Sequence, residues 1–232
     1  MQNIVLNIPH SSVAGIYGPY GKWPRNPAFV NECVNRWTDW YADLLFASTD
    51  PRVMGVVFPY SRFVCDVERL DDDPLEASGQ GILYRTFGGY SRGALTDQET
   101  AHLLGLRAAH IDALRRHLTP DSLLLDCHSF PGTADDCDVC LGFNDDGTYD
   151  ERTVTLVKEQ FERMHYSVSL NRPYAHAFAP ATGFAYRSLM IEVNKRVYMA
   201  PDDGPVGLNP SVRPWMRWLG CMDRIYRILL DE

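Results

Sequence analysis

Three apolar segments of the chain end in side chains that can bind a metal ion or transfer a proton. The segment "NIVLNIPH" stops at a proline and presents a histidine, "LLLDCHSF" carries an aspartate and a histidine, and "LMIEVNK" carries a single glutamate. A fourth segment, "YSRFVCDVERLDDD", is rich in arginine and acidic residues. The side chains of interest are therefore His10, Asp126, His128 and Glu192, with Arg62, Asp66, Glu68 and Arg69 from the fourth segment.

Two histidines and one carboxylate are a common ligand set for a catalytic zinc ion, which keeps one coordination position open for water. His10 and His128 supply the imidazoles, and either Glu68 or Asp66 supplies the carboxylate. A further carboxylate, Glu192, is suited to accept the proton of a water molecule whose pKa is lowered by zinc. The pattern predicts a hydrolase, and an amide is the natural bond for it to cleave.

Strands and helices alternate along the chain. Short β-branched runs predict strands at 3–8, 52–58, 122–130, 138–143 and 188–194, and apolar residues at helical spacing predict helices at 27–47, 96–118, 151–165 and 209–230. This alternation predicts an α/β fold, in which ligands bind at the carboxyl ends of the strands. The loops at 71–95 and 171–187 are rich in Gly, Pro, Asp and Arg and are expected to form the walls of the site.

The composition limits the possible partners. A chain of 232 residues with 45% hydrophobic residues can form one large core, which predicts a single domain over 1–232. The formal net charge of -8 argues against a nucleic-acid partner, because phosphate binding needs a basic surface. No apolar run reaches the roughly 20 residues that cross a bilayer, and no secretion signal is present, which favours a cytoplasmic protein with reduced cysteines. The sequence does not indicate an oligomeric state.

The segments "NIPHSS", "RFVCDVERLDDD", "GQGILYRTFGG", "LLLDCHSFP" and "IEVNKRVYM" occur in order over residues 7–199. Together they resemble the successive blocks of the N-formylglutamate amidohydrolase family, which is similar in fold to the zinc-dependent exopeptidases. The resemblance implies a three-layer α/β/α sandwich with a mostly parallel or mixed central sheet. It also implies a zinc-dependent amidohydrolase that acts on a small anionic N-acyl amino acid, with N-formyl-L-glutamate, cleaved to formate and L-glutamate, as the first candidate.

The same resemblance implies roles for individual residues. His10 and His128 are the expected metal ligands and Glu192 the expected general base, while Arg69 corresponds to an arginine that helps to hold the substrate carboxylate. The aspartoacylase relatives among the zinc-dependent exopeptidases usually place a ligand glutamate three residues after the first histidine, where this chain has Val13. Glu68 is therefore expected to replace it, with Asp66 as the alternative. Arginine clamps suit carboxylates, so the expected substrate-binding residues are Arg62, Arg69, Arg85 and Arg92.

Other interpretations remain open from the sequence. The same metal centre would serve a carboxypeptidase or a deacylase of another N-acyl amino acid, and Val13 also leaves room for a binding domain that has lost turnover. Glu192 could instead form a buried ion pair, for which Arg187, Lys195 and Arg196 are the candidates. Three histidines, His102, His110 and His117, lie seven or eight residues apart on one predicted helix and are expected to face solvent.

Overall fold

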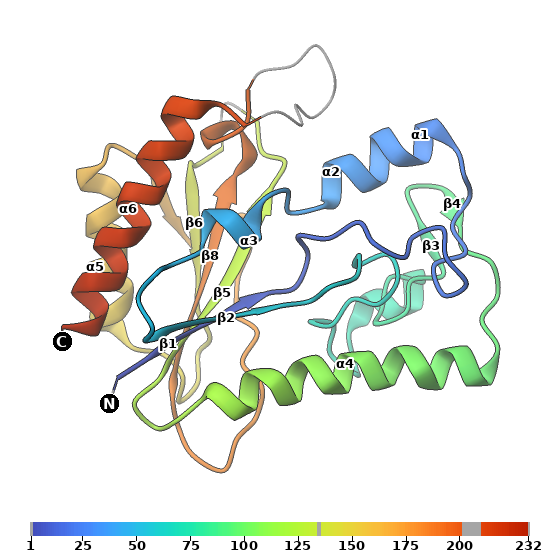
Figure 1. The fold of residues 1–232 in the computed structure, drawn as a ribbon, viewed down its shortest axis with the longest axis horizontal. Coiled ribbons are helices and arrows are strands. Elements are labelled where there is room, and N and C mark those ends of the chain that lie inside the picture. The colour runs from blue at the N-terminus through green and yellow to red at the C-terminus, as the bar shows by residue number, and fades with distance from the viewer. Residues whose placement is uncertain (1, 134–135, 201–209, 232) are drawn as a thin grey trace.

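A mixed six-stranded sheet lies at the centre of the molecule (Figure 1). The computed structural model describes residues 2–133, 136–200 and 210–231. The strands of the central sheet are β1 (Ile4–Ile8), β2 (Val53–Val57), β5 (Leu123–Phe130), β6 (Val139–Gly142), β7 (Val168–Leu170) and β8 (Arg187–Asn194). Their order is β2-β1-β5-β8-β6-β7, and a separate hairpin is formed by β3 (Thr86–Phe87) and β4 (Tyr90–Ser91).

The four strands that carry the chemistry or flank it run parallel to one another. β2, β1, β5 and β8 are parallel neighbours, whereas β6 pairs antiparallel with β8 and β7 follows β6. In this register Asn7 of β1 is the partner of Asp126 of β5, and His128 of β5 is the partner of Glu192 of β8. The carboxyl ends of β1, β5 and β8 therefore meet at one edge, as the sequence predicted.

Helices cover both faces of the sheet. The helical segments are α1 (Pro27–Phe29), a π-helical turn (Val30–Val34), α2 (Asn35–Trp37), α3 (Ala42–Leu45), α4 (Asp97–His117), α5 (Glu151–Arg163) and α6 (Val212–Leu230), with 3-10 turns at Pro74–Ser78 and Lys195–Val197. Helices α3, α5 and α6 lie together on one side of the sheet, and α4 lies on the other (Figure 1). This is the expected α/β/α layering.

The alternation of side chains along each strand separates the core from the site. On β5, Leu123, Leu125 and Cys127 belong to the core cluster shared with α3, α5 and α6. Asp126 and His128 lie on the opposite face, where Leu124 packs with residues of α4. The same strand thus fills the core with one set of residues and presents polar groups with the other.

Most predicted elements are confirmed, with two informative differences. The expected helix at 27–47 is interrupted, because α2 ends at Trp37 and the chain turns through Tyr41, whose φ is 63°, before α3. His110 is buried rather than solvent-facing, since its side chain is only 6% exposed beneath β1 and β2. The final helix begins at Val212; Asn209, expected to open it, lies outside the described residues.

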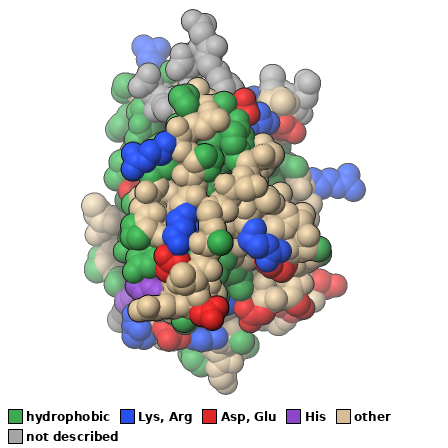
Figure 2. All heavy atoms as spheres, turned by 90° about the vertical axis from the view of Figure 1, so that its right-hand side faces the viewer, with side chains coloured by type: hydrophobic (Ala, Val, Ile, Leu, Met, Phe, Trp, Pro, Cys, Tyr) green, Lys and Arg blue, Asp and Glu red, His purple; other side chains and the backbone are tan. Residues whose placement is uncertain are grey.

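The surface agrees with the acidic composition. On the face drawn in Figure 2, basic and acidic side chains are interspersed. This face therefore does not form one continuous basic surface. All six cysteines are free. Among the helices in the described part of the chain, none has the length and apolar character needed to span a membrane.

Candidate metal centre and active site

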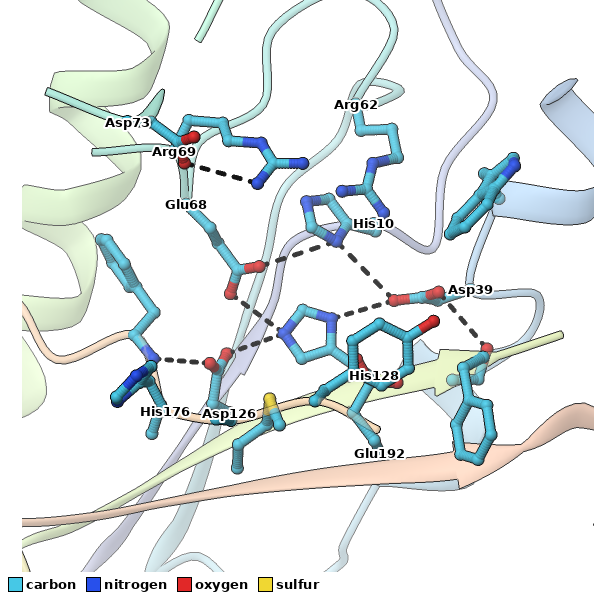
Figure 3. A pocket seen from close by; sticks show the side chains of 18 of the residues that line it. His10, Asp39, Arg62, Glu68, Arg69, Asp73, Asp126, His128, His176 and Glu192 are labelled. Atoms are coloured by element: carbon cyan, nitrogen blue, oxygen red, sulfur yellow. Dashed lines mark hydrogen bonds and ion pairs between the residues drawn. The ribbon is translucent and has the colours of Figure 1, made fainter. Parts of the chain in front are cut away.

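A cavity of about 540 Å³ opens over the carboxyl ends of β1, β5 and β8 (Figure 3). Its polar floor is formed by the strand ends and by the segment that follows β2, and both loops that were expected to form its walls contribute to it. The charged and imidazole side chains that line it are His10, Asp39, Arg62, Glu68, Arg69, Asp73, Asp126, His128, His176 and Glu192. Six of the nine site residues expected from the sequence are in this set; Asp66, Arg85 and Arg92 are not.

The two expected metal ligands lie side by side. His10 lies two positions after the end of β1, and His128 lies near the end of β5, 118 positions later. Their ring centroids are 5.2 Å apart, and their side chains are 3% and 5% exposed. A single ion therefore has access to both imidazoles.

The two nitrogens of His10 have different surroundings. Nε2 lies 2.8 Å from Oδ1 of Asp66, and because an ionised carboxylate only accepts, Nε2 is the donor. Nδ1 lies 3.7 Å from Oδ2 of Asp39 and 3.6 Å from Oε2 of Glu68. This buried nitrogen has no hydrogen-bond partner among the residues that the structure describes.

His128 repeats this arrangement. Its Nδ1 lies 3.0 Å from Oδ2 of Asp39, and its Nε2 lies 3.1 Å from both Oε1 of Glu68 and Oδ1 of Asp126. The Nδ1 atoms of both histidines consequently face the same carboxylate oxygen of Asp39, and each Nε2 is held by another carboxylate. In metal sites a ligating histidine commonly has its second nitrogen held in this way.

Asp39 was not expected from the sequence. It lies in the interruption between α2 and α3, where its backbone N–H donates to the carbonyl of His10 at 3.0 Å. The phenol of Tyr198 donates to the carbonyl of Trp40 at 3.0 Å and stabilises the same turn. The apolar helical spacing continues through 38–41, so the spacing did not predict the break, which contacts from His10 and Tyr198 help to hold.

Negative charge is concentrated around the histidines. Burial alone would disfavour ionised carboxylates, but the two histidines lower the pKa of Asp39, and Arg62 with His10 lowers the pKa of Asp66 far below its usual range. Burial raises the pKa of Glu68 to about 7, with Asp126 contributing in the same direction. Burial also opposes protonation of His128, yet Glu68 and Asp126 raise its pKa well above the usual value. A cation at this position would offset the surplus negative charge.

Three groups of donors are close enough to hold a metal ion. They are His10 with Asp39 and His128, His10 with Asp66 and Glu68, and Glu68 with Asp126 and His128. Imidazole and carboxylate donors are those that zinc accepts in catalytic sites, and the free Nδ1 of His10 is a buried lone pair that such an ion would satisfy. The donor set therefore fits a zinc ion.

Glu192 faces the same cavity from β8. Its side chain is 9% exposed, and Oε2 has no hydrogen-bond partner within residues 2–133, 136–200 and 210–231. Burial raises its pKa to about 8. The three cations considered as its partners are engaged elsewhere: Arg187 is 3.8 Å from Asp150, Arg196 is 3.0 Å from Asp138, and Lys195 donates to the carbonyl of Arg36.

Two arginines bring positive charge to the opposite wall. Arg62 donates to Oδ2 of Asp66 at 2.9 Å, and Arg69 lies 3.5 Å from the same oxygen and 3.4 Å from Asp73. Both guanidinium groups also contact the Tyr84 hydroxyl, at 3.3 and 3.4 Å, so the two cations are neighbours. Both line the cavity and flank one place where a carboxylate could bind.

The structure does not bring the other two arginines to this cavity. Arg85 is exposed on the surface and pairs with Glu76, and Arg92 is buried, donating to the backbone carbonyls of Tyr20, Val64 and Tyr84. Both line a second cavity, and Leu70 lines both cavities. The sequence indicates the type of these side chains but not their direction.

Comparisons with known proteins show the family and the fold of the chain. The family model of N-formylglutamate amidohydrolase matches residues 3–199. The crystal structure of N-formylglutamate amidohydrolase from Ralstonia eutropha JMP134 has the same fold, with a TM-score of 0.74 and 18% identity over 98% of this chain and 94% of that chain. A gene product of Agrobacterium tumefaciens is similar with a TM-score of 0.65 and 16% identity, over 99% of this chain and 89% of that one.

No curated protein matches the chain. The family model nevertheless spans most of its length, including the ends of β1, β5 and β8 that form the site. The chain belongs to the N-formylglutamate amidohydrolase family, which makes it an amidohydrolase with a small-molecule substrate.

Proposed function

We propose that the protein is a zinc-dependent amidohydrolase that removes the acyl group from an N-acyl amino acid, with N-formyl-L-glutamate as the first candidate substrate. The observation that carries this proposal is the convergence of His10, Asp39 and His128 on one point beneath a cavity, with Glu192 beside them. Membership of the family supplies the reaction class.

The proposed ligands are Nδ1 of His10, Nδ1 of His128 and a carboxylate oxygen of Asp39. Both nitrogens face the same oxygen of Asp39, and each ring is oriented through its Nε2 by other carboxylates. Glu68, the ligand expected from the sequence, is the alternative to Asp39, because its Oε2 lies 3.6 Å from Nδ1 of His10. Asp66 is the weaker candidate, because Arg62 and Tyr84 occupy its second oxygen at 2.9 and 2.6 Å.

A bound zinc ion supplies polarisation of the scissile carbonyl and acidification of a water molecule. Glu192 accepts a proton from the attacking water at its free oxygen, Oε2, and the water oxygen bonds to the carbonyl carbon. As the carbon–nitrogen bond breaks, Glu192 returns the proton to the leaving nitrogen. Burial raises the pKa of Glu192, which makes its carboxylate a stronger proton acceptor than an exposed one. The products are a carboxylate and a free amino acid.

Arg62 and Arg69 are proposed to bind the substrate carboxylate. Guanidinium groups pair with carboxylates through two parallel hydrogen bonds, and both arginines border the cavity on the same side. This pairing would orient the substrate so that its amide nitrogen lies over the two histidines. Arg85 and Arg92 have no part in this proposal, because they lie outside the cavity.

The apolar wall of the cavity favours a second candidate, a deacylase for a bulkier N-acyl amino acid. The apolar side chains that line the cavity are Trp37, Leu75, Phe130, Tyr174 and Phe178, and an apolar acyl group would pack against them. N-formylglutamate has two carboxylates, and each would need a cation. Arg62 and Arg69 lie together, so this pair would bind one of the two carboxylates.

The test is a substrate panel on the purified protein with zinc analysis. The expected result is about one zinc ion per chain, hydrolysis that a chelator abolishes and zinc restores, and activity on at least one N-formyl or N-acyl amino acid. N-formyl-L-glutamate is compared with N-formyl-L-leucine and their N-acetyl analogues to separate the two candidates. Full activity in the metal-free protein would reject the metal mechanism, and no hydrolysis across the panel would reject the amidohydrolase proposal.

A further inference from the structure

Asn7 occupies a position in the sheet where an apolar side chain would be expected. It is the fourth residue of the five-residue strand β1 and is completely buried, and its neighbours Leu6 and Ile8 are core residues. Asparagine is unfavourable in strands, and a buried amide costs free energy unless its hydrogen bonds are made. Its presence therefore has to be explained by its partners.

Those partners are the two carboxylates that hold His128. Nδ2 of Asn7 donates to Oε1 of Glu68 at 2.7 Å and to Oδ1 of Asp126 at 2.9 Å. These are the same two oxygens that lie 3.1 Å from Nε2 of His128. Asn7 and His128 thus share the pair of oxygens, and Figure 3 shows both carboxylates directed at one side of the His128 ring.

The orientation of the Asn7 amide is determined by its surroundings. Both oxygens of Asp126 face donors, because Oδ2 accepts from the backbone N–H of Phe178 at 2.7 Å and Oδ1 lies 3.1 Å from Nε2 of His128. The NH2 group of Asn7 must therefore face Asp126, which leaves Oδ1 to face α4. There Nε2 of His110 lies 2.8 Å away and must be the donor.

His110 is suited to this task. It is buried in α4, with its ring edge-on to Phe58 at 5.5 Å, and burial together with the charge of His10 lowers its pKa to about 4. The neutral ring has a single N–H, which the Asn7 carbonyl accepts. A chain of directed hydrogen bonds therefore runs from α4 through β1 to the carboxylates on Nε2 of His128.

We infer that Asn7, oriented by His110, is a positioning residue for the metal site: it fixes Glu68 and Asp126 on Nε2 of His128 and so presents Nδ1 of that ring to the metal. The inference rests on the proposed metal site. It assigns a role to two residues that contact neither the cavity nor the proposed ligand atoms. Partners of this kind typically change metal affinity by about 10- to 100-fold when they are removed.

The chain offers a matched control at the other end of the same strand. Asn3 precedes β1 and also connects to α4, since its Nδ2 donates to the carbonyl of His117 at 3.0 Å and its Oδ1 accepts from Ser122 at 2.6 Å. It makes the same kind of contact between strand and helix without touching the site. Asn3→Asp therefore disturbs the contact between β1 and α4, as Asn7→Asp does, at a residue that does not touch the metal site.

The experiment measures zinc affinity by competition with a chromophoric chelator, and the visible absorption spectrum of the cobalt(II)-substituted protein. Asn7→Asp should raise the zinc Kd by about 10- to 100-fold and change the cobalt spectrum. Asn3→Asp should leave the zinc Kd within about twofold and the spectrum unchanged, even if it lowers Tm. His110→Phe, which lacks the N–H, should weaken zinc binding more than His110→Gln, which keeps a side-chain donor.

Several results would overturn the inference. One is a folded Asn7→Asp variant with wild-type zinc affinity and cobalt spectrum, and another is an equal change in Asn3→Asp. If Asn7→Asp does not fold, the two His110 variants provide the test. Equal zinc affinities for His110→Phe, His110→Gln and the wild type would reject the positioning role. A wild-type protein that binds no zinc rejects the proposed metal site as well, whereas wild-type binding with unchanged variants rejects only the role of Asn7.

Discussion

Nδ1 of His128 lies 3.0 Å from Oδ2 of Asp39, although 89 positions separate the two residues in the sequence. The contact exists because the chain leaves its helical path after Trp37 and is tied to the carbonyl of His10 through the backbone N–H of Asp39. One turn therefore connects the break in the helix with both histidines. In the proposed metal site, Asp39 would supply the carboxylate that Val13 does not provide.

The first prediction separates Asp39 from Glu68 as the third metal ligand. Asp39→Asn should raise the zinc Kd by more than about 100-fold, because it removes a charged ligand, whereas Glu68→Gln should raise it by about 10- to 100-fold, the effect of an orienting partner. Chelator competition on both folded variants, checked by circular dichroism, gives the comparison. If Glu68→Gln weakens zinc binding more than Asp39→Asn does, Glu68 is the third ligand.

The strand ends could be predicted from the sequence, and the loops between them could not. β1, β5 and β8 are short apolar runs whose polar terminal residues stand out, so the meeting of His10, His128 and Glu192 in one cavity followed from the parallel topology. Asp39 was hidden because helical spacing continues through its position. Its placement depends on the His10 carbonyl and on Tyr198, contacts that are distant in sequence.

The arginines illustrate the same limit. Arg62 and Arg69 follow β2 closely and reach the cavity, where Asp66 and Tyr84 hold them. Arg92 lies in a loop whose path brings it among backbone carbonyls, and Arg85 finds Glu76 on the surface. All four look equivalent in the sequence, because residue type alone does not state which way a loop side chain points.

The second prediction concerns Glu192. Glu192→Gln should lower kcat by about 100- to 10,000-fold, because the amide cannot accept the water proton, while zinc content stays at the wild-type level. Metal analysis and product formation on the best substrate of the panel provide the two measurements. Loss of zinc in the variant would instead place Glu192 among the ligands, and unchanged kcat would remove it from the mechanism.

The third prediction tests the carboxylate site with a matched pair of arginines. Arg69→Ala should raise KM by about 10- to 100-fold for a substrate with a free carboxylate, since a charged hydrogen bond is worth about 1.5–3 kcal/mol. Arg85→Ala should leave KM unchanged, because Arg85 lies on the surface with Glu76. For a substrate that is amidated at that carboxylate, the two variants should have the same KM. Equal KM values for wild type and Arg69→Ala would contradict the proposed clamp.

The last prediction follows from the burial of His110. Burial and the charge of His10 lower its pKa from 6.5 to about 4, so the unfolded chain binds this proton at higher pH than the folded chain does. The contribution of His110 to the free energy of unfolding is therefore fully present above about pH 6.5 and falls by about 3 kcal/mol as the pH drops towards 4. Urea unfolding of the metal-free protein at pH 7 and pH 4 should show a smaller loss of stability for His110→Gln than for the wild type. His102→Gln replaces an exposed histidine of the same helix and should lose as much stability as the wild type, because it retains His110. The same loss in all three proteins would mean that the proton uptake by His110 does not differ between the folded and unfolded chains.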